Sequence, residues 1–145
     1  MTTHVASVIN EVRLLNNRLV ELVDELHDDS SITAPQRAVL EFILRNGPAT
    51  VPTIARDRGV TRQHIQTISN ELKSLDLIKP QHNPAHQRSP MHELTKAGRK
   101  TIDDLFERER DYLAARVSDL NENQLITTAQ TLADLRHALR KETQQ

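Results

Sequence analysis

The sequence predicts a mainly α-helical protein with one small β-hairpin. Three observations indicate this fold class. Apolar residues recur at helical spacing along most of the chain, only 3 of the 145 residues are Gly and 6 are Pro, and the one long stretch without helical periodicity lies between two short strand-like runs. A chain of this length is expected to form a single domain, residues 1–145, with a substantial core.

The first predicted element is a long helix over residues 4–28. Its apolar residues follow one another at spacings of three and four, which aligns them in a seam, as in a coiled coil. This seam consists of Val5, Val8, Val12, Leu15, Leu19, Leu22 and Leu26. One small domain can hardly cover the seam and the apolar C-terminal helices as well, so we expect two copies of the chain to bury it between them. The alternative is an intramolecular bundle of this helix with the last two helices.

Two helix signals separated by a tight turn occupy the centre of the chain. Thr50 is a suitable N-cap, Pro52 lies in the first turn, and Gly59 ends this helix because glycine adopts the left-handed conformation without strain. Thr61 caps the second helix. Its apolar stripe consists of Ile65, Ile68, Leu72 and Leu75. Its polar face carries Arg62, Gln63, Gln66, Asn70 and Lys73. This pattern is typical of a helix-turn-helix, since such side chains pair with guanine and adenine edges in the major groove.

A hairpin is predicted after the second helix. Residues 77–80 and 91–94 are strand-like, and residues 81–90 between them have no apolar period. Pro80 and Pro90 cannot donate a ladder hydrogen bond, so the strands are expected to be short. The order of elements predicts a winged helix-turn-helix over residues 33–95, with the hairpin as the wing.

Two further helices are predicted after the hairpin. The first runs from Thr95, its expected cap, to about Leu120, and the second from Asn121 to about Lys141. Asn121 followed by Gln124 is a capping-box signal. The stripe of the last helix consists of Leu125, Ala129, Leu132, Leu135 and Leu139. We expect residues 96–141 to form a helical dimerisation region together with residues 4–28.

The central segment resembles the winged-helix domain of the multiple antibiotic resistance regulator (MarR) family of bacterial transcription factors. The matching elements are Thr33–Leu40, the helix that begins at Val60-Thr61, residues 72–78, the wing from Asn83 to Arg88, and Leu94–Gly98. The flanking helices match as well. The wing departs from the family pattern, because Asn83-Pro84-Ala85-His86-Gln87-Arg88 stands where the family usually has Asp-Pro-x-Asp-Arg-Arg. Asp76 replaces the usual glycine after the recognition helix, and it tolerates the left-handed conformation better than most residues.

The resemblance implies a homodimer that binds palindromic operators, more often as a repressor than as an activator. Candidate DNA-binding residues are Thr61, Arg62, Gln63, His64, Gln66, Thr67, Asn70, Lys73, Lys79, His86, Gln87 and Arg88. Arg88 is the only arginine of the hairpin and thus the expected probe of the minor groove. Family members often bind a small aromatic or phenolic effector in a crevice beside the dimerisation helices. That crevice would fall near Asn17, Arg18, Phe42 and Phe106. Ordinary core packing is the alternative for the two phenylalanines.

Charge is distributed in favour of the DNA-binding interpretation. The formal net charge is −1, but residues 51–100 hold nine basic and four acidic residues, whereas residues 1–50 and 101–145 are each acidic by three. Basic residues over a helix-turn-helix and wing are expected to contact phosphates. The alternative is a winged-helix module that binds proteins and has no specific DNA binding, but such a face usually presents Leu, Tyr or Trp anchors.

Other functional classes receive little support from the sequence. The acidic run of residues 103–111 alternates with Arg108 and Arg110, as on a solvated helix face, and there is no phosphate loop or nucleophile elbow, so no enzymatic activity is expected. The chain has no Cys, which excludes disulfides and thiolate chemistry. No two of its seven histidines have a ligand spacing on a helix, and His82, His86 and His92 are expected in a loop without a supporting scaffold, so no metal or other cofactor is predicted. The lack of a signal sequence favours a cytoplasmic protein.

Overall fold

The computed structural model describes residues 2–27, 32–82, 85 and 88–139. The chain forms two compact units, Met1–Glu109 and Arg110–Gln145. The helices are α1 (Thr2–His27), α2 (Ala34–Asn46), α3 (Val51–Arg58), α4 (Arg62–Ser74), α5 (Lys96–Ala114) and α6 (Glu122–Ala138). The strands are β1 (Ala49–Thr50), β2 (Ile78–Gln81) and β3 (Met91–Leu94). The predicted fold class, mainly α with a small β wing, is confirmed.

Capping residues set the boundaries of the central helices. Thr50 caps α3 by accepting from the Thr53 N–H, and Gly59 ends this helix in the left-handed conformation at φ 66°. Thr61 then caps α4, as expected from the sequence. At α2, Thr33 forms a full capping box with Gln36, whose side-chain amide also donates to Glu71 of α4 at 2.9 Å. The helix-turn-helix prediction is therefore confirmed, and α2 is tied to α4 by a side-chain hydrogen bond.

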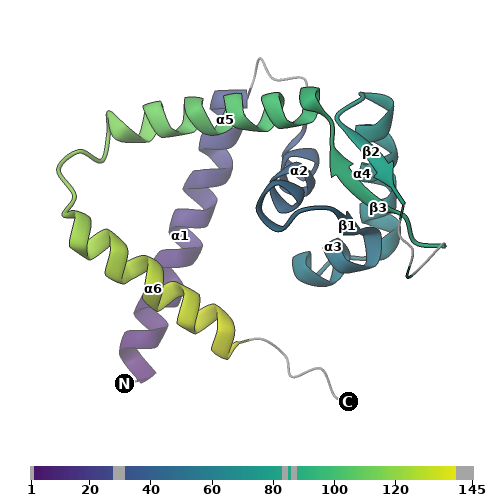
Figure 1. Ribbon diagram of the computed structural model, residues 1–145. Coiled ribbons are helices and arrows are strands. Elements are labelled where there is room, and N and C mark those ends of the chain that lie inside the picture. Colours follow the sequence, from purple (N-terminus) through teal and green to yellow (C-terminus); the bar gives the residue numbers. More distant parts are fainter. Residues whose placement is uncertain (1, 28–31, 83–84, 86–87, 140–145) are drawn as a thin grey trace. The chain divides into compact units, whose positions relative to one another are not determined.

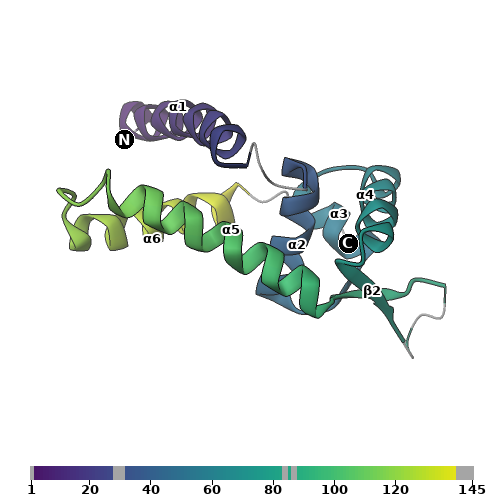
Figure 2. The ribbon, with the colours of Figure 1, turned by 90° about the horizontal axis from the view of Figure 1, so that it is seen from above.

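The sheet has three antiparallel strands in the order β1-β3-β2 (Figure 1). The sequence indicates only the hairpin of β2 and β3, because the two residues of β1 are too few to show a period of two. In the register, His92 of β3 lies opposite Ala49 on one side and Pro80 on the other. Figure 2 shows the β2–β3 hairpin projecting from the packed helices. β3 is therefore the central strand and β2 the edge, where Pro80 loses no ladder partner on its open side.

The core of the first unit lies between α2, α3, α4, the sheet and the start of α5. Its buried residues include Leu40, Ile54, Leu72 and Ile102. Asp76 adopts φ 58°, which confirms the left-handed turn expected after the recognition helix. Leu75, which the sequence places on the buried stripe, is instead 45% exposed, since it is the C-cap of α4 and lies beyond the last buried turn.

The start of α5 packs tightly on the turn between α4 and β2. Thr95 caps α5, since its hydroxyl oxygen accepts from the Gly98 N–H at 2.9 Å and its hydroxyl donates to the Asp76 carbonyl at 2.6 Å. A Cβ at Gly98 would lie 1.9 Å from the Leu77 carbonyl oxygen, so only glycine fits there. These contacts fix the start of α5 against the turn between α4 and β2.

One expected helix limit is wrong. α5 ends at Ala114 and not near Leu120, because Ser118 and Asp119 follow in a stretch of turns whose N–H groups bond over three or four residues. α6 is described as far as Ala138, and the expected limit near Lys141 lies outside the described residues. Its cap Asn121 accepts from the Gln124 N–H as expected.

The seam of α1 and the stripe of α6 are largely uncovered in the single chain. Within the α1 seam only Leu22 is buried, while Leu15 is 55% exposed and Leu19 41% exposed. No residue of α6 is buried, and Leu139 at its C-cap is 70% exposed. Such long apolar faces are unfavourable in water unless something covers them.

Candidate nucleic-acid interface

The first turn of α4 presents three polar side chains to the surface. Thr61 adopts extended backbone angles and its hydroxyl accepts from the His64 N–H at 3.1 Å, so the helix begins at Arg62. Arg62, Gln63 and His64 are all exposed. The opposite face of α4 is buried through Ile65, Ile68, Ser69 and Leu72. Since this inner face is held by the core, the outer face keeps a fixed orientation.

The second and third turns of α4 hold their polar side chains in local hydrogen bonds. Gln66 is half-buried, and its Nε2 donates to Asn70 Oδ1 at 3.0 Å. The Thr67 hydroxyl donates to the Gln63 carbonyl at 3.0 Å, which leaves its oxygen free only to accept. Lys73 ends this row and is exposed.

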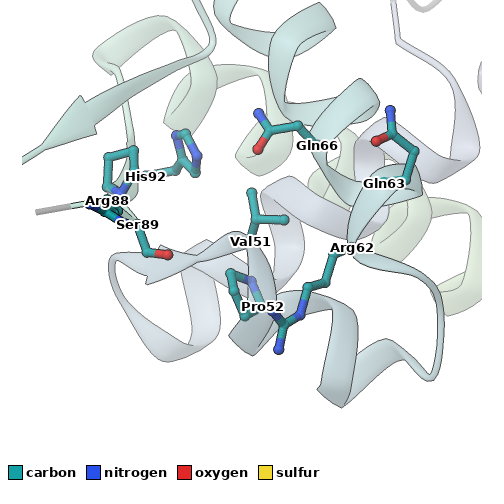
Figure 3. A pocket seen from close by; sticks show the side chains of 9 residues that line it. Val51, Pro52, Arg62, Gln63, Gln66, Arg88, Ser89 and His92 are labelled. Atoms are coloured by element: carbon teal, nitrogen blue, oxygen red, sulfur yellow. The ribbon is translucent and has the colours of Figure 1, made fainter. Parts of the chain in front are cut away.

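A cavity of about 290 Å³ lies between α4 and the hairpin, as Figure 3 shows. Arg62, Gln63 and Gln66 line it from α4, and Arg88 lines it from the hairpin. The remaining lining residues are Val51, Pro52, Ser89, Pro90 and His92. Both charged residues of this lining are arginines, so the cavity is electropositive. The structure thus brings Arg88 of the wing and three candidate residues of the recognition helix around one space.

His92 is a site residue that the sequence reasoning missed. The expectation that it lies in an unsupported loop is wrong, because it belongs to β3 and is only 1% exposed. Burial and, secondly, the positive charge of Lys73 lower the pKa of its imidazole, so it is neutral at pH 7. Its Nδ1 has no hydrogen-bond partner among the described residues. The signal was present, since alternation along a strand puts His92 on the same face as the apolar Leu94.

Other candidate DNA-binding residues lie apart from this cavity. His64 lines a second cavity of about 280 Å³ together with Arg58 of α3, Pro35 of α2 and other residues of α2, α4 and the turn between α3 and α4. Lys79 forms an ion pair with Glu93 across the hairpin at 3.4 Å and remains more than half exposed. His86 and Gln87 lie outside the described residues.

The four candidate effector residues have two different settings. Asn17 and Arg18 are on the exposed surface of α1, where Arg18 pairs with Glu21 at 2.7 Å. Phe42 and Phe106 are half-buried and pack against the core. The ring of Phe106 also lies under the guanidinium groups of Arg37 and Arg45, 5.5 and 5.7 Å from its centroid. Core packing therefore accounts for both phenylalanines as they stand, and none of the four residues lines either cavity described above.

Two features are absent from the described residues. No group of three or more His, Cys, Asp or Glu side chains in this part of the chain could hold a metal ion. No helix within the described ranges is both long and apolar enough to cross a membrane.

Comparison with known sequences points to one family. Residues 30–89, from before α2 to the hairpin, match the family model of the MarR family. Uncharacterized proteins of Mycobacterium tuberculosis and Mycobacterium bovis are each 44% identical to this chain over 59 residues. This match spans 41% of the chain and about two fifths of the length of these curated relatives.

Solved structures share the fold of this chain over nearly its whole length. A crystal structure of a MarR family transcription regulator is 25% identical and has a TM-score of 0.78, with 94% of this chain and 90% of that chain covered. A MarR family protein from Bacillus stearothermophilus has a TM-score of 0.79 at 19% identity, covering 97% and 99%. Staphylococcus aureus MarR in complex with salicylate and kanamycin has a TM-score of 0.82 at 16% identity, covering 94% and 93%. Residues 30–89 are thus similar to the MarR family, and the chain has the fold of MarR family transcription regulators.

Proposed function

We propose that this chain is a sequence-specific DNA-binding transcription regulator that acts in the cytoplasm. The observation that carries the proposal is the arrangement of Arg62, Gln63 and Gln66 on α4 opposite Arg88 of the hairpin, around one electropositive cavity. Guanidinium and amide groups are the side chains that read guanine and adenine edges. A protein-binding module would expose apolar anchors on this face, whereas the first turn of α4 is polar throughout.

In the proposed docking, the start of α4 enters the major groove. Arg62 donates to guanine O6 and N7, while Gln63 and Gln66 reach the neighbouring bases. Arg88, with Gln87 and His86 of the wing, lies along the minor groove. The remaining candidate residues contact the phosphate backbone of the DNA or hold the base-contacting side chains in place. These residues are Thr61, His64, Thr67, Asn70, Lys73 and Lys79.

The regulator is proposed to act as a homodimer on palindromic operators. The exposed seam of α1 and the uncovered stripe of α6 support this, since two copies could bury both. Two recognition helices related by a two-fold axis fit half-sites about 10 base pairs apart. By analogy with the family we propose repression, with release by a small aromatic acid, a ligand class found in the Staphylococcus aureus structure. Asn17, Arg18, Phe42 and Phe106 remain the proposed contacts for that acid.

Selection of bound fragments from the source genome, followed by titration of the best fragment, tests the proposal. We expect a small set of fragments that share an inverted repeat, and a dissociation constant that rises steeply with salt because Lys and Arg displace counterions. The Arg62→Ala/Gln66→Ala double variant is the matched control, and it should retain only weak binding of all fragments. Equal binding of every fragment by the wild type, or none, would instead favour the protein-interaction module.

A further inference from the structure

His92 is a buried polar side chain that the proposed DNA contacts leave unused. It lies on the central strand β3, is 1% exposed, and has no hydrogen-bond partner at Nδ1 among the described residues. A buried nitrogen without a partner is unfavourable, because water bonds to it in the unfolded chain. An apolar side chain at this position would avoid that loss. The imidazole therefore calls for a role beyond core packing.

Gln66 is the partner that the surroundings offer to His92. Both line the cavity between α4 and the hairpin, where the other uncharged polar side chains are Gln63 and Ser89. In Figure 3 the Gln66 amide points towards the His92 side of the cavity, whereas the Gln63 amide lies on the far side. Gln63 is also exposed to solvent, and Ser89 already takes part in another interaction.

Gln66 has more hydrogen-bonding groups than its bond to Asn70 uses. A side-chain amide offers two N–H groups and two oxygen lone pairs. Asn70 takes one N–H, through the 3.0 Å bond from Gln66 Nε2. A hydrogen bond from the His92 N–H to Gln66 Oε1 would take one lone pair. One N–H and one lone pair would remain, and these are the groups that adenine requires at N7 and at its N6 amino group.

We propose that His92 is a positioning residue. It holds the Gln66 amide from the side of the cavity, so that this amide pairs with an adenine in each half-site. This inference rests on the proposed DNA-binding function. Nδ1 has no partner among the described residues, and the proposed contact forms as α4 docks on DNA. Both side chains border the same cavity.

A double-mutant cycle on the selected operator tests this role. Duplexes with each of the four bases at every half-site position are titrated with the wild type, Gln66→Ala, His92→Leu and the double variant. We expect the wild type to prefer adenine at one position by roughly 5- to 100-fold. His92→Leu should lose most of that preference, and the double variant should match Gln66→Ala. His92→Gln, which again supplies an N–H donor, should restore the preference.

Two further variants complete the design. His82→Leu is the matched control, since His82 is an exposed histidine beside β2, and it should keep the full adenine preference. Melting curves show whether His92→Leu folds, and His92→Met carries the same test if it does not, since Met adapts to irregular space. An adenine preference that survives in the apolar variants, or effects of His92 and Gln66 that add independently, would overturn the role of His92 alone. A wild type without any base preference would overturn the proposed function as well.

Discussion

Arg62 and Gln63 follow the N-cap Thr61 directly. This one cap therefore sets the position of the side chains proposed to contact bases. The Thr61 hydroxyl accepts from the His64 N–H and ends the turn from α3, and the next residues emerge at the helix N-terminus. The sequence alone predicts this correctly, because a cap, a glycine and an apolar period are local signals. It does not predict that Arg88 and Gln66 line one cavity, since that contact joins residues far apart in the chain.

Replacing Arg62 by Ala should weaken binding to the selected operator by about 1–3 kcal/mol and relax the preference at one position of each half-site. The reason is that a guanidinium which donates to a guanine edge is lost, while the fold stays intact because the side chain is exposed. Fluorescence anisotropy with the operator and single-base variants measures both effects. Arg108→Ala removes the same charge from an exposed position on α5 and should leave binding unchanged. Wild-type affinity and selectivity in Arg62→Ala would show that α4 docks differently.

Acidification should destabilise the protein through His92. The pKa of its imidazole is lowered in the folded chain, so between pH 6.5 and that lower pKa the unfolded chain binds more protons. The stabilisation by the neutral form is thus fully present above about pH 6.5 and is lost as the pH falls towards the folded pKa. The surrounding groups disfavour the protonated imidazole. Lys73 repels a positive charge, and the strand neighbours Ala49 and Pro80 carry no charge that could offset it.

Urea unfolding at pH 8 and at pH 5 measures this dependence. The wild type should lose more stability than His92→Leu over that interval, whereas the exposed control His82→Leu should behave like the wild type. Parallel pH profiles for the wild type and His92→Leu would mean that His92 is solvated in solution.

At the scale of elements, the sequence predicts best those helices and strands that carry a cap or a long apolar period. The helices with caps at Thr50, Thr61, Thr95 and Asn121 begin where the sequence indicates. The sequence does not predict strand β1, because two residues show no alternation and the pairing partner β3 lies some 40 positions later. The sequence also does not indicate the end of α5, since no Gly or Pro marks it and the residues after Ala114 still include apolar side chains.

The hairpin is expected to contribute affinity for DNA of any sequence, whereas α4 contributes selectivity. Arg88 lies in the loop just before β3 and lines the cavity, and the minor groove that it would enter carries a degenerate base code. Arg88→Ala should therefore weaken binding to all sequences alike and lower the slope of log affinity against log salt by about one unit. Salt titrations on operator and unrelated DNA measure this, with Arg62→Ala as the contrasting variant that changes selectivity. An unchanged slope and affinity would mean that the hairpin stays off the DNA.

At the scale of the whole molecule, we propose that a second copy of the chain covers the long apolar faces of α1 and α6. Leu19 is 41% exposed in the single chain and lies in the middle of the α1 seam. Leu19→Asp should dissociate or unfold the protein, because a carboxylate would be buried between two helices. Sedimentation at micromolar concentration should give a dimer for the wild type. Asn10→Asp, on the opposite side of α1, is the matched control and should remain a dimer. A wild type that is a stable monomer under these conditions would contradict the dimer and remove the reason to expect palindromic sites.

The most direct test of the account is the ratio of two dissociation constants at one salt concentration. One is for the operator selected from the genome, and the other is for a duplex of the same length and composition with its sequence shuffled. Regulators that read base edges discriminate between such duplexes by a factor of about 1,000 or more. We predict a ratio of that order for the wild type, which falls sharply in the Arg62→Ala/Gln66→Ala double variant. A ratio near one for the wild type would contradict sequence-specific DNA binding by α4.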